Sequence, residues 1–295
     1  MAGRRRKKSG GRSYAWRYRG RIVACVFVEV IIICALVIMI GWNKGVKEWF
    51  EQFEQPVLKE VDISGINSPN AILMQARGGK ILGEINGEAQ IYPASMTKIM
   101  TVILGIENFD DLDEKITLTN EMFTGLYEQD ATQAGFQPGE EVRVIDLLYG
   151  AMLPSGAECC IALADTISGS EADFAELMNK KARKLGMENT NFCDSTGLHN
   201  PDHYSTVKDI AVLMKYCIKN DTFREIVETS RHSTGVTNIH PDGITYYSTM
   251  FKNLSDPTVT GGKILGGKTG YTSEAGHCLV SFAEIEGREY IFVSA

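Results

Sequence analysis

The sequence predicts an α+β fold in which one sheet takes its strands from both ends of a helical block. Three observations support this prediction. Short apolar runs flank a Gly-Gly turn near residue 78, apolar helical segments fill the middle of the chain, and strand patterns return after residue 263. Because such elements bury their apolar faces against one another, we expect a sheet packed against helices. A single apolar helix is expected to precede this unit.

The N-terminal region reads as a tail followed by a membrane anchor. Residues 1–21 hold nine basic residues and no acidic one, so the net charge of −7 leaves −16 for the rest of the 295-residue chain. Residues 22–42 are apolar except for Glu29 and are long enough to cross a bilayer as a helix. The positive-inside rule then places the tail in the cytoplasm and everything after Trp42 outside.

A cleaved signal peptide and a nucleic-acid-binding tail are less favoured assignments for this region. A signal peptide has a shorter apolar core, and no small-x-small cleavage site follows Gly41. A basic block can bind nucleic acid, but directly before a membrane span it acts as a topology signal that can also touch anionic lipid. We therefore expect an uncleaved anchor in the lipid bilayer and no nucleic-acid partner, and we assign Glu29 no role.

Residues 43–66 are predicted to be a stalk beside the membrane. Val46, Trp49, Phe50 and Phe53 recur at helical spacing with charges between them. This pattern fits either an amphipathic helix lying at the lipid surface or a helix docked on the protein body.

The external part opens with a predicted β-hairpin, Ala71–Arg77 and Ile81–Asn86 around a Gly-Gly turn. Polar, turn-rich sequence follows from Leu112 to Glu141. The predicted helices are 142–167, which is interrupted at Leu153–Gly156, then 174–185 and 207–218. The last strands are expected at 278–285 and 290–293, on either side of a Glu-Gly-Arg turn.

A serine and a lysine lie three residues apart in the stretch Tyr92–Met100. At the first turn of a helix, Ser95 and Lys98 share one face and can meet. The following residues, Ile99–Ile106, are apolar almost all round, which predicts a buried helix. Burial lowers the pKa of an amine, so the lysine can take the serine proton and create a nucleophile. Alone this pair is a weak signal, because serine and lysine are common.

Two further motifs strengthen the case. Ser155-Gly156-Ala157 falls in the break between two predicted helices, where a hydroxyl can project into a cleft. Lys268-Thr269-Gly270 offers a cation for a carboxylate beside glycines that allow close backbone approach. In this order and at these separations, the three motifs match the signature of β-lactamases and penicillin-binding proteins.

With these motifs, the chain resembles the serine D-alanyl-D-alanine carboxypeptidases among the low-molecular-mass penicillin-binding proteins. Family-like stretches also occur at Phe192–Leu198, His203–Asp209 and Gly267–Gly276. The resemblance covers residues 67–295, which we expect to form a serine DD-peptidase domain. It implies a penicillin-binding/β-lactamase-like fold, an antiparallel sheet flanked by helices with a helical insert. It also implies no cofactor, a peptidoglycan stem peptide ending in D-Ala-D-Ala as substrate, and β-lactam antibiotics as acylating inhibitors.

The resemblance implies three catalytic residues. Ser95 would attack the carbonyl between the two D-alanines and form an acyl-enzyme. Lys98 would be the base, its pKa lowered by burial and by Lys268. Ser155 would relay a proton to the leaving amine.

It implies substrate-binding residues as well. Lys268 and Thr269, followed by Gly270, would hold the terminal carboxylate. The backbone N–H groups of Ser95 and Tyr271 would form the oxyanion hole.

The sequence departs from the family pattern at two places. The second motif usually ends in Asn, but here it ends in Ala157, so a side-chain amide is missing; Glu158 is a candidate for partial replacement. The usual final helix and any extra C-terminal domain do not follow the last strand, and we expect a truncated C-terminus. Neither departure touches Ser95 or Lys98.

Histidines and cysteines are predicted to have no catalytic part. A Ser-His-Asp triad is left open by spacing, but no Gly-x-Ser-x-Gly surrounds Ser95. His203 and His277 are expected to be structural, in a turn and a strand. The five external cysteines lack C-x-x-C spacing and read as small buried hydrophobes, and no cluster predicts a metal site.

The leading hypothesis is therefore a membrane-anchored carboxypeptidase on the outer side of a bacterial cell membrane. A β-lactamase is disfavoured, because no Glu-x-x-Leu-Asn stretch lies between Ser155 and Lys268. A penicillin-binding sensor that acylates without turnover has Ala157 as its only support. A transpeptidase would differ only in what receives the acyl group.

Overall fold

The structure is a computed structural model that describes residues 59–254 and 256–295. The predicted basic tail, the membrane anchor at 22–42 and the helical part of the stalk lie outside the described residues. Within the described ranges, no helix is both long enough and apolar enough to span a bilayer. The described residues belong to one compact unit that begins at Lys59.

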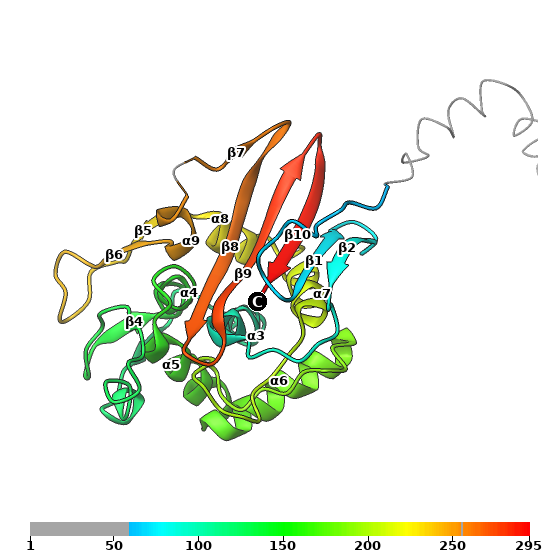
Figure 1. The fold of residues 1–295 in the computed structure, drawn as a ribbon. Coiled ribbons are helices and arrows are strands. Elements are labelled where there is room, and N and C mark those ends of the chain that lie inside the picture. Colours follow the sequence, from blue (N-terminus) through cyan, green and yellow to red (C-terminus); the bar gives the residue numbers. More distant parts are fainter. Residues whose placement is uncertain (1–58, 255) are drawn as a thin grey trace, which may run out of the picture. The chain divides into compact units, whose positions relative to one another are not determined.

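One antiparallel sheet of six strands takes its strands from both ends of this unit, as predicted (Figure 1). Its order is β2-β1-β10-β9-β8-β7. The strands are β1 (Ala71–Gln75), β2 (Ile81–Ile85), β7 (Thr258–Val259), β8 (Gly262–Thr272), β9 (Gly276–Ile285) and β10 (Arg288–Ser294). The predicted hairpin is β1 with β2, and β1 joins the C-terminal strands by pairing with β10.

The helices lie between β2 and β7 in the chain. They are α3 (Lys98–Asn108), α4 (Val144–Met152), α5 (Ala157–Ser168), α6 (Glu171–Leu185), α7 (Val207–Cys217), α8 (Asp221–Glu228) and α9 (Thr249–Lys252). Short 3₁₀ turns, η1 (Ala94–Thr97) and η2 (Glu121–Phe123), and two ribbons, β3 (Lys115–Thr117) with β4 (Glu141–Arg143) and β5 (Arg231–Ser233) with β6 (Thr245–Tyr247), complete the unit. The predicted break at 153–156 separates α4 from α5. The sequence patterns predicted no element in the stretch that forms α8, α9 and the β5–β6 ribbon.

Helix α6 begins at Glu171, ahead of the predicted Phe174, because of its N-cap. The Ser170 hydroxyl accepts a hydrogen bond from the backbone N–H of Asp173, and Glu171 and Asp173 favour the positive end of the helix dipole. The helix ends at Leu185, and its C-cap residue Gly186 has a left-handed φ of 81°, which suits glycine.

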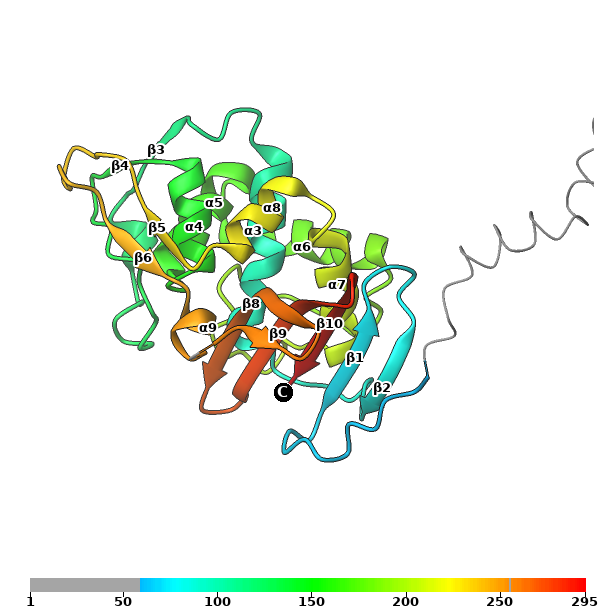
Figure 2. The same ribbon diagram turned by 90° about the horizontal axis from the view of Figure 1, so that it is seen from above.

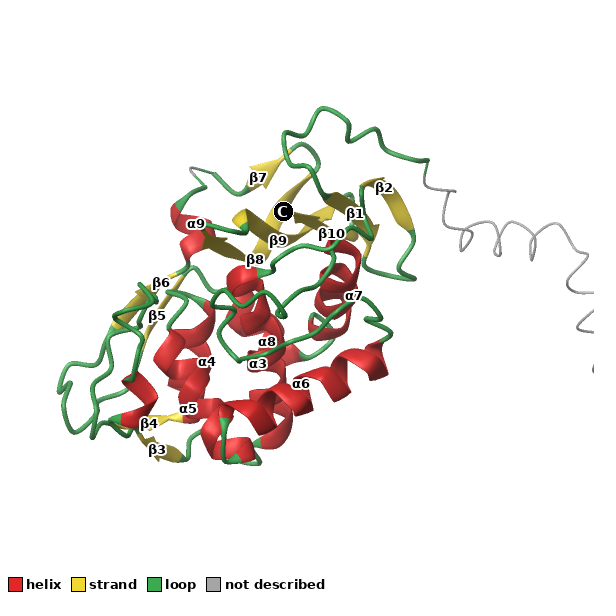
Figure 3. Ribbon diagram, turned by 60° about the horizontal axis from the view of Figure 1, so that its bottom comes forward, coloured by secondary structure: helices red, strands yellow, loops and turns green. Residues whose placement is uncertain are grey.

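Helix α3 is the centre of the helical layer. Its residues 98–105 are all buried, as the apolar pattern predicted, and it packs against α4, α5, α7 and α8 (Figure 2). Gly105 permits the close approach of α4, since a Cβ there would lie 2.7 Å from a methyl carbon of Leu148. Helices α3 to α8 gather on one side of the six-stranded sheet (Figure 3). Turn η1, which leads into α3, packs on β8 and β9 and so joins the two layers.

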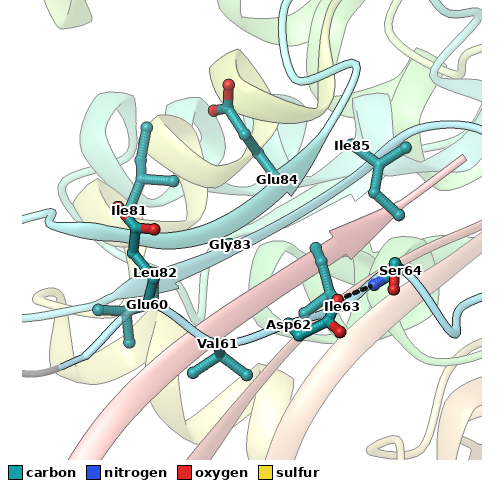
Figure 4. Close-up of a pocket in the computed structure, with 10 residues that line it drawn as sticks. All are labelled: Glu60, Val61, Asp62, Ile63, Ser64, Ile81, Leu82, Gly83, Glu84 and Ile85. Carbon is teal, nitrogen blue, oxygen red and sulfur yellow. Dashed lines mark hydrogen bonds between the residues drawn. The ribbon is translucent and has the colours of Figure 1, made fainter.

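Residues 59–66, assigned to the stalk by prediction, contain no helix and run beside β2 (Figure 4). The backbone N–H of Val61 donates to the carbonyl of Leu82 at 2.6 Å. Gly83 makes this approach possible, because a Cβ there would lie 2.5 Å from the Val61 carbonyl oxygen. Residues 60–64 and 81–85 line a pocket of about 530 Å³, which holds none of the predicted site residues.

Candidate active site

The first predicted pair meets where η1 becomes α3. The side-chain nitrogen Nζ of Lys98 lies 3.0 Å from Oγ of Ser95. The same Nζ donates to the carbonyl oxygen of Thr196 at 2.6 Å. Ser95 lies in a 3₁₀ turn rather than in the first α-helical turn, and it follows Ala94, whose φ of 46° is unusual for a residue with a side chain. A strained residue directly before a nucleophile indicates a turn that its surroundings hold firmly.

Both lysines of the motifs are buried, and burial sets their protonation. Lys98 is only 3% exposed, and burial is the main cause of a lowered pKa. The thiol of Cys160 and the carboxylates of Asp194 and Glu158 act in the opposite direction and raise the pKa of Lys98. Burial and the charge of Lys98 together hold the pKa of Lys268 well below its usual value. The repulsion between the two lysine charges therefore lowers the pKa of Lys268.

The second pair joins the helical layer to the sheet. Ser155 lies in the turn after α4, and its Oγ accepts a hydrogen bond of 2.9 Å from Nζ of Lys268 in β8. Ser155 has a φ of 75°, a left-handed conformation that aims its side chain from a tight turn. Lys268 also donates to the carbonyl of Thr269 at 2.9 Å. The pair thus links residues 113 positions apart.

One cavity of about 600 Å³ opens beside both pairs. Its lining includes five of the seven predicted site residues, which are Ser95, Ser155, Thr269, Gly270 and Tyr271. The other two, Lys98 and Lys268, are bonded to the two serines. The structure therefore brings all seven residues into one site.

Strand β8 forms one wall of this cavity. Gly270 lets the strand approach the nucleophile, because a Cβ there would lie 3.0 Å from the backbone nitrogen of Ser95. The hydroxyl of Thr269 lies 2.8 Å from that of Thr249 at the start of α9. Tyr271 is 61% exposed, and its ring lies 4.8 Å from that of His277 on β9.

One edge of β8 has no strand partner along most of this wall. Strand β9 pairs with β8 along its whole length, whereas β7 pairs only with residues 262–263. From Gly266 to Thr272, no described strand covers the other edge. Unpaired backbone groups of an edge strand can bind an added strand, so this edge can accept the main chain of a peptide substrate.

Glu158 does not take the place of the missing amide. It is fully buried, and its carboxylate accepts hydrogen bonds from the backbone N–H groups of Ala134 at 2.6 Å and Gly135 at 3.0 Å. It is not part of the cavity lining. Its neighbour Ala157 is also buried and bonds through its N–H to the carbonyl of Thr132, a cavity residue. The end of the second motif thus holds the 132–135 loop against the cavity.

The sequence analysis did not predict the loop around Thr196, which binds Lys98. Thr196 supplies a carbonyl to the lysine, and Asp194 and His203 support that loop. The sequence signal was indirect, since these residues lie in two family-like stretches but their types suggested no contact with Lys98. His203 is buried as expected of a structural histidine, and His277 lies in β9. Among the residues that the structure describes, no group of histidine, cysteine and acidic side chains could hold a metal ion.

The known proteins whose sequences are similar to this chain agree on one enzyme family. A family model described as D-alanyl-D-alanine carboxypeptidase matches residues 57–294. The chain is 35% identical over 219 residues to the D-alanyl-D-alanine carboxypeptidase DacF of Bacillus subtilis (strain 168), covering 73% of this chain and 54% of DacF. It is 36% identical over 205 residues to the D-alanyl-D-alanine carboxypeptidase of Streptomyces sp. (strain K15), covering 67% of this chain and 69% of that protein.

Solved structures agree with the sequence matches. The crystal structure of the Streptomyces K15 DD-transpeptidase superposes with a TM-score of 0.71 at 29% identity, covering 79% of this chain and 91% of that one. Penicillin binding protein 5 from Haemophilus influenzae gives a TM-score of 0.68 at 27% identity, covering 79% and 66%. The fold is therefore penicillin-binding-like, as the resemblance implied. The chain spans about half the length of the first curated relatives, 54% of DacF and 55% of DacC of Escherichia coli (strain K12).

Proposed function

The chain belongs to the D-alanyl-D-alanine carboxypeptidase family, and we propose that it removes the terminal D-alanine from peptidoglycan stem pentapeptides. The observation that carries the proposal is the 3.0 Å contact between Nζ of the buried Lys98 and Oγ of Ser95 beside an open cavity. Burial lowers the pKa of the Lys98 amine and so favours its neutral, proton-accepting form, and its contact with a hydroxyl creates a nucleophile.

In the proposed acylation, Lys98 takes the hydroxyl proton as Oγ of Ser95 bonds to the carbonyl carbon between the two D-alanines. The backbone N–H groups of Ser95 and Tyr271 stabilise the resulting oxyanion. The peptide C–N bond then breaks. Ser155, which is bonded to Lys268, delivers its proton to the leaving amine and regains one from Lys98, so that Lys98 is neutral again and free D-alanine departs.

Recognition of the substrate falls to the β8 wall. Lys268 and Thr269 bind the terminal carboxylate through charge-assisted hydrogen bonds, and the open edge of β8 binds the peptide main chain. Deacylation follows when neutral Lys98 takes a proton from water as the water attacks the ester. Lys98 then returns this proton to Oγ of Ser95 as the ester C–O bond breaks, which releases the shortened peptide and restores both residues. A β-lactam would acylate Ser95 in the same way and act as an inhibitor.

The test is mass-spectrometric detection of D-alanine released from a stem pentapeptide by the 295-residue chain and by a Ser95→Ala variant. We expect release by the parent and none by the variant. Fluorescent penicillin is added to both proteins as a probe of acylation. Labelling of the parent at Ser95 without D-alanine release would refute the carboxypeptidase proposal and leave an acylating site without turnover on this peptide.

A transpeptidase is the second candidate, because the Streptomyces K15 structure that this chain resembles is described as a DD-transpeptidase. In that reaction, an amine rather than water would take the acyl group from Ser95. Adding a glycine-containing acceptor peptide to the same assay separates the two. A transpeptidase joins the acyl group to the acceptor, whereas a strict carboxypeptidase yields only the shortened peptide.

We also propose that residues 22–42 anchor the catalytic unit on the outer side of a bacterial cell membrane. The length of the apolar run and the basic residues before it support this orientation. Carbonate extraction of bacterial membranes would leave an anchored chain in the pellet, and protease added to spheroplasts would digest the catalytic unit. Recovery of the chain in the carbonate supernatant would refute the anchor.

A further inference from the structure

A partly buried carboxylate, that of Asp194, organises the loop that contacts Lys98. Oδ1 of Asp194 accepts hydrogen bonds from the backbone N–H groups of Thr196 and Gly197 and from the hydroxyl of Thr196, each at 2.7 Å. These three bonds fix the peptide groups around Thr196. The carbonyl oxygen of Thr196 is the acceptor that Nζ of Lys98 reaches at 2.6 Å. Asp194 thus controls the position of an atom that touches the base.

The other oxygen of Asp194 faces His203, whose ring also contacts the turn that holds the nucleophile. Oδ2 lies 3.2 Å from Nδ1 of His203, which is also 3.2 Å from the backbone nitrogen of Cys193. Nε2 of the same ring lies 2.8 Å from the hydroxyl of Thr97. Thr97 directly precedes Lys98 in the chain. This hydrogen-bond network therefore reaches Lys98 from two sides. One is Thr97, its neighbour in the chain, and the other is Thr196, whose carbonyl accepts its hydrogen bond.

Packing leaves the residues of this hydrogen-bond network little freedom to move. His203 is 2% exposed, Thr97 is fully buried, and the ring of Phe192 meets the imidazole edge-on at 5.6 Å. Gly197 has a φ of 79°, and a Cβ there would lie 1.9 Å from the carbonyl oxygen of Ala94. The loop and the nucleophile turn therefore touch backbone to backbone, and glycine is required at the contact.

We propose that Asp194 and His203 are positioning residues for the general base, holding the amine of Lys98 toward Oγ of Ser95. This inference rests on the proposed function, because it takes Lys98 as the base. Neither residue lines the cavity. They act through the Thr196 carbonyl on one side and through Thr97 on the other.

The charge of Asp194 gives this role a measurable effect, a change in the pKa of Lys98. Burial alone would raise the pKa of Asp194, but hydrogen bonds from His203, Thr196 and Gly197 outweigh it and lower the pKa to about 2. Asp194 is therefore ionised at neutral pH, and its charge raises the pKa of Lys98. The other titratable groups that act on Lys98 are Cys159, Cys160 and Glu158 on α5, and Lys268 faces it from β8.

The test measures the rate of acylation by fluorescent penicillin against pH in the full chain. Asp194→Ala removes the acceptor and the charge, and we expect acylation to fall about a hundredfold, the cost of a small displacement of a reacting group. Asp194→Asn keeps an acceptor for the loop but removes the charge that raises the pKa of Lys98. The rise of the rate with pH should then move to lower pH, with a loss at the plateau smaller than that of the alanine variant.

Asp202→Asn is the matched control. Asp202 is an exposed residue close to His203 in the chain, and its replacement changes the net charge of the protein by the same amount. We expect it to leave the pH profile unshifted. A folded Asp194→Ala variant that acylates within about twofold of the parent would overturn the proposal, and so would an Asp194→Asn profile that coincides with the control.

A second readout does not depend on turnover. Lysine labelled with ¹³C at Cε reports the titration of Lys98 by NMR in a Ser95→Ala background, with a further Lys98→Met variant to assign the signal. Asp194→Asn should move this titration to lower pH, and an unmoved signal would refute the proposal even if the protein bound no penicillin. D-alanine release is assayed separately. A parent that is acylated without releasing D-alanine would therefore refute only the proposed function.

Discussion

The two serine–lysine pairs of the cavity are alike in geometry and different in origin. Ser95 and Lys98 are three residues apart and meet at 3.0 Å, whereas Ser155 and Lys268 are 113 residues apart and meet at 2.9 Å. Both lysines are buried. The geometry of one turn sets the first pair, while the packing of β8 against the turn after α4 sets the second.

This difference separates two tasks. A nucleophile and its base require a short, fixed distance, which a single turn supplies at low entropic cost. Recognition of a carboxylate requires a charge placed across the cavity from the nucleophile, which only tertiary packing can supply. We therefore expect changes at the local pair to reduce the chemical step and a change at Lys268 of the distant pair to reduce substrate selection.

The largest effect is expected from Lys98→Met, which removes the base and keeps an unbranched side chain in its place. Acylation by penicillin and release of D-alanine should each fall about a thousandfold, within the range that general base catalysis contributes. Stopped-flow fluorescence with labelled penicillin measures the loss. Lys180→Met, on the exposed face of α6, is the control and should acylate at the parent rate. Rapid acylation of a folded Lys98→Met protein would contradict the assignment of the base.

A smaller and more selective loss is expected from Lys268→Gln. Without its cation, kcat/KM for a peptide with a free terminal carboxylate should fall about a hundredfold, since a charge-assisted hydrogen bond contributes about 2–3 kcal/mol. The matched substrate carries a terminal carboxamide, which the parent should cleave poorly. The variant should process the two substrates at similar rates. If it kept the full preference of the parent for the carboxylate, Lys268 would not be its binding partner.

The same contrast between local and tertiary origin explains what the sequence could predict. The β1–β2 hairpin, the final strands and the burial of α3 follow from apolar patterns within each segment, and all three predictions are confirmed. The meeting of Ser95 and Lys98 followed from their spacing. The seven site residues could be assembled in advance only because their three motifs matched a known family.

Features fixed by partners distant in the chain could not be predicted. The carbonyl of Thr196 binds Lys98, but every residue has a carbonyl, so no residue type marks this contact. The β5–β6 ribbon is held by contacts such as His232 Nε2 to Asp146 Oδ1 at 3.0 Å, between residues far apart in the chain. Glu158 looked free to enter the site, and only the fold showed its carboxylate engaged with the 134–135 backbone.

A moderate effect should follow from Gly270→Ala, which disturbs the contact between the two regions. The added Cβ would lie 3.0 Å from the Ser95 nitrogen and 3.1 Å from the Ala94 Cβ, so the wall and the nucleophile turn must separate slightly. We expect acylation to fall about tenfold, because reacting groups tolerate little displacement. Gly65→Ala is the control, since a Cβ at that position would have no neighbour within 4 Å. Equal acylation rates in the two variants would mean that the close approach of β8 has no catalytic value.

The smallest expected effect is the uptake of a proton on substrate binding, not a change in reaction rate. Burial and the charge of Lys98 hold the pKa of Lys268 below its usual value in the free protein. A bound carboxylate favours the charged form and raises that pKa again, so binding should take up a proton at pH values between the two pKa values. Calorimetry of the inactive Ser95→Ala variant, with a D-Ala-D-Ala peptide in buffers of different ionisation enthalpy, measures this uptake. Lys268→Gln should abolish it while the carboxylate still enters the cavity. Binding enthalpies independent of the buffer in the Ser95→Ala protein would show that Lys268 is already charged before substrate arrives, and the repulsion between the two lysines would then have no part in recognition.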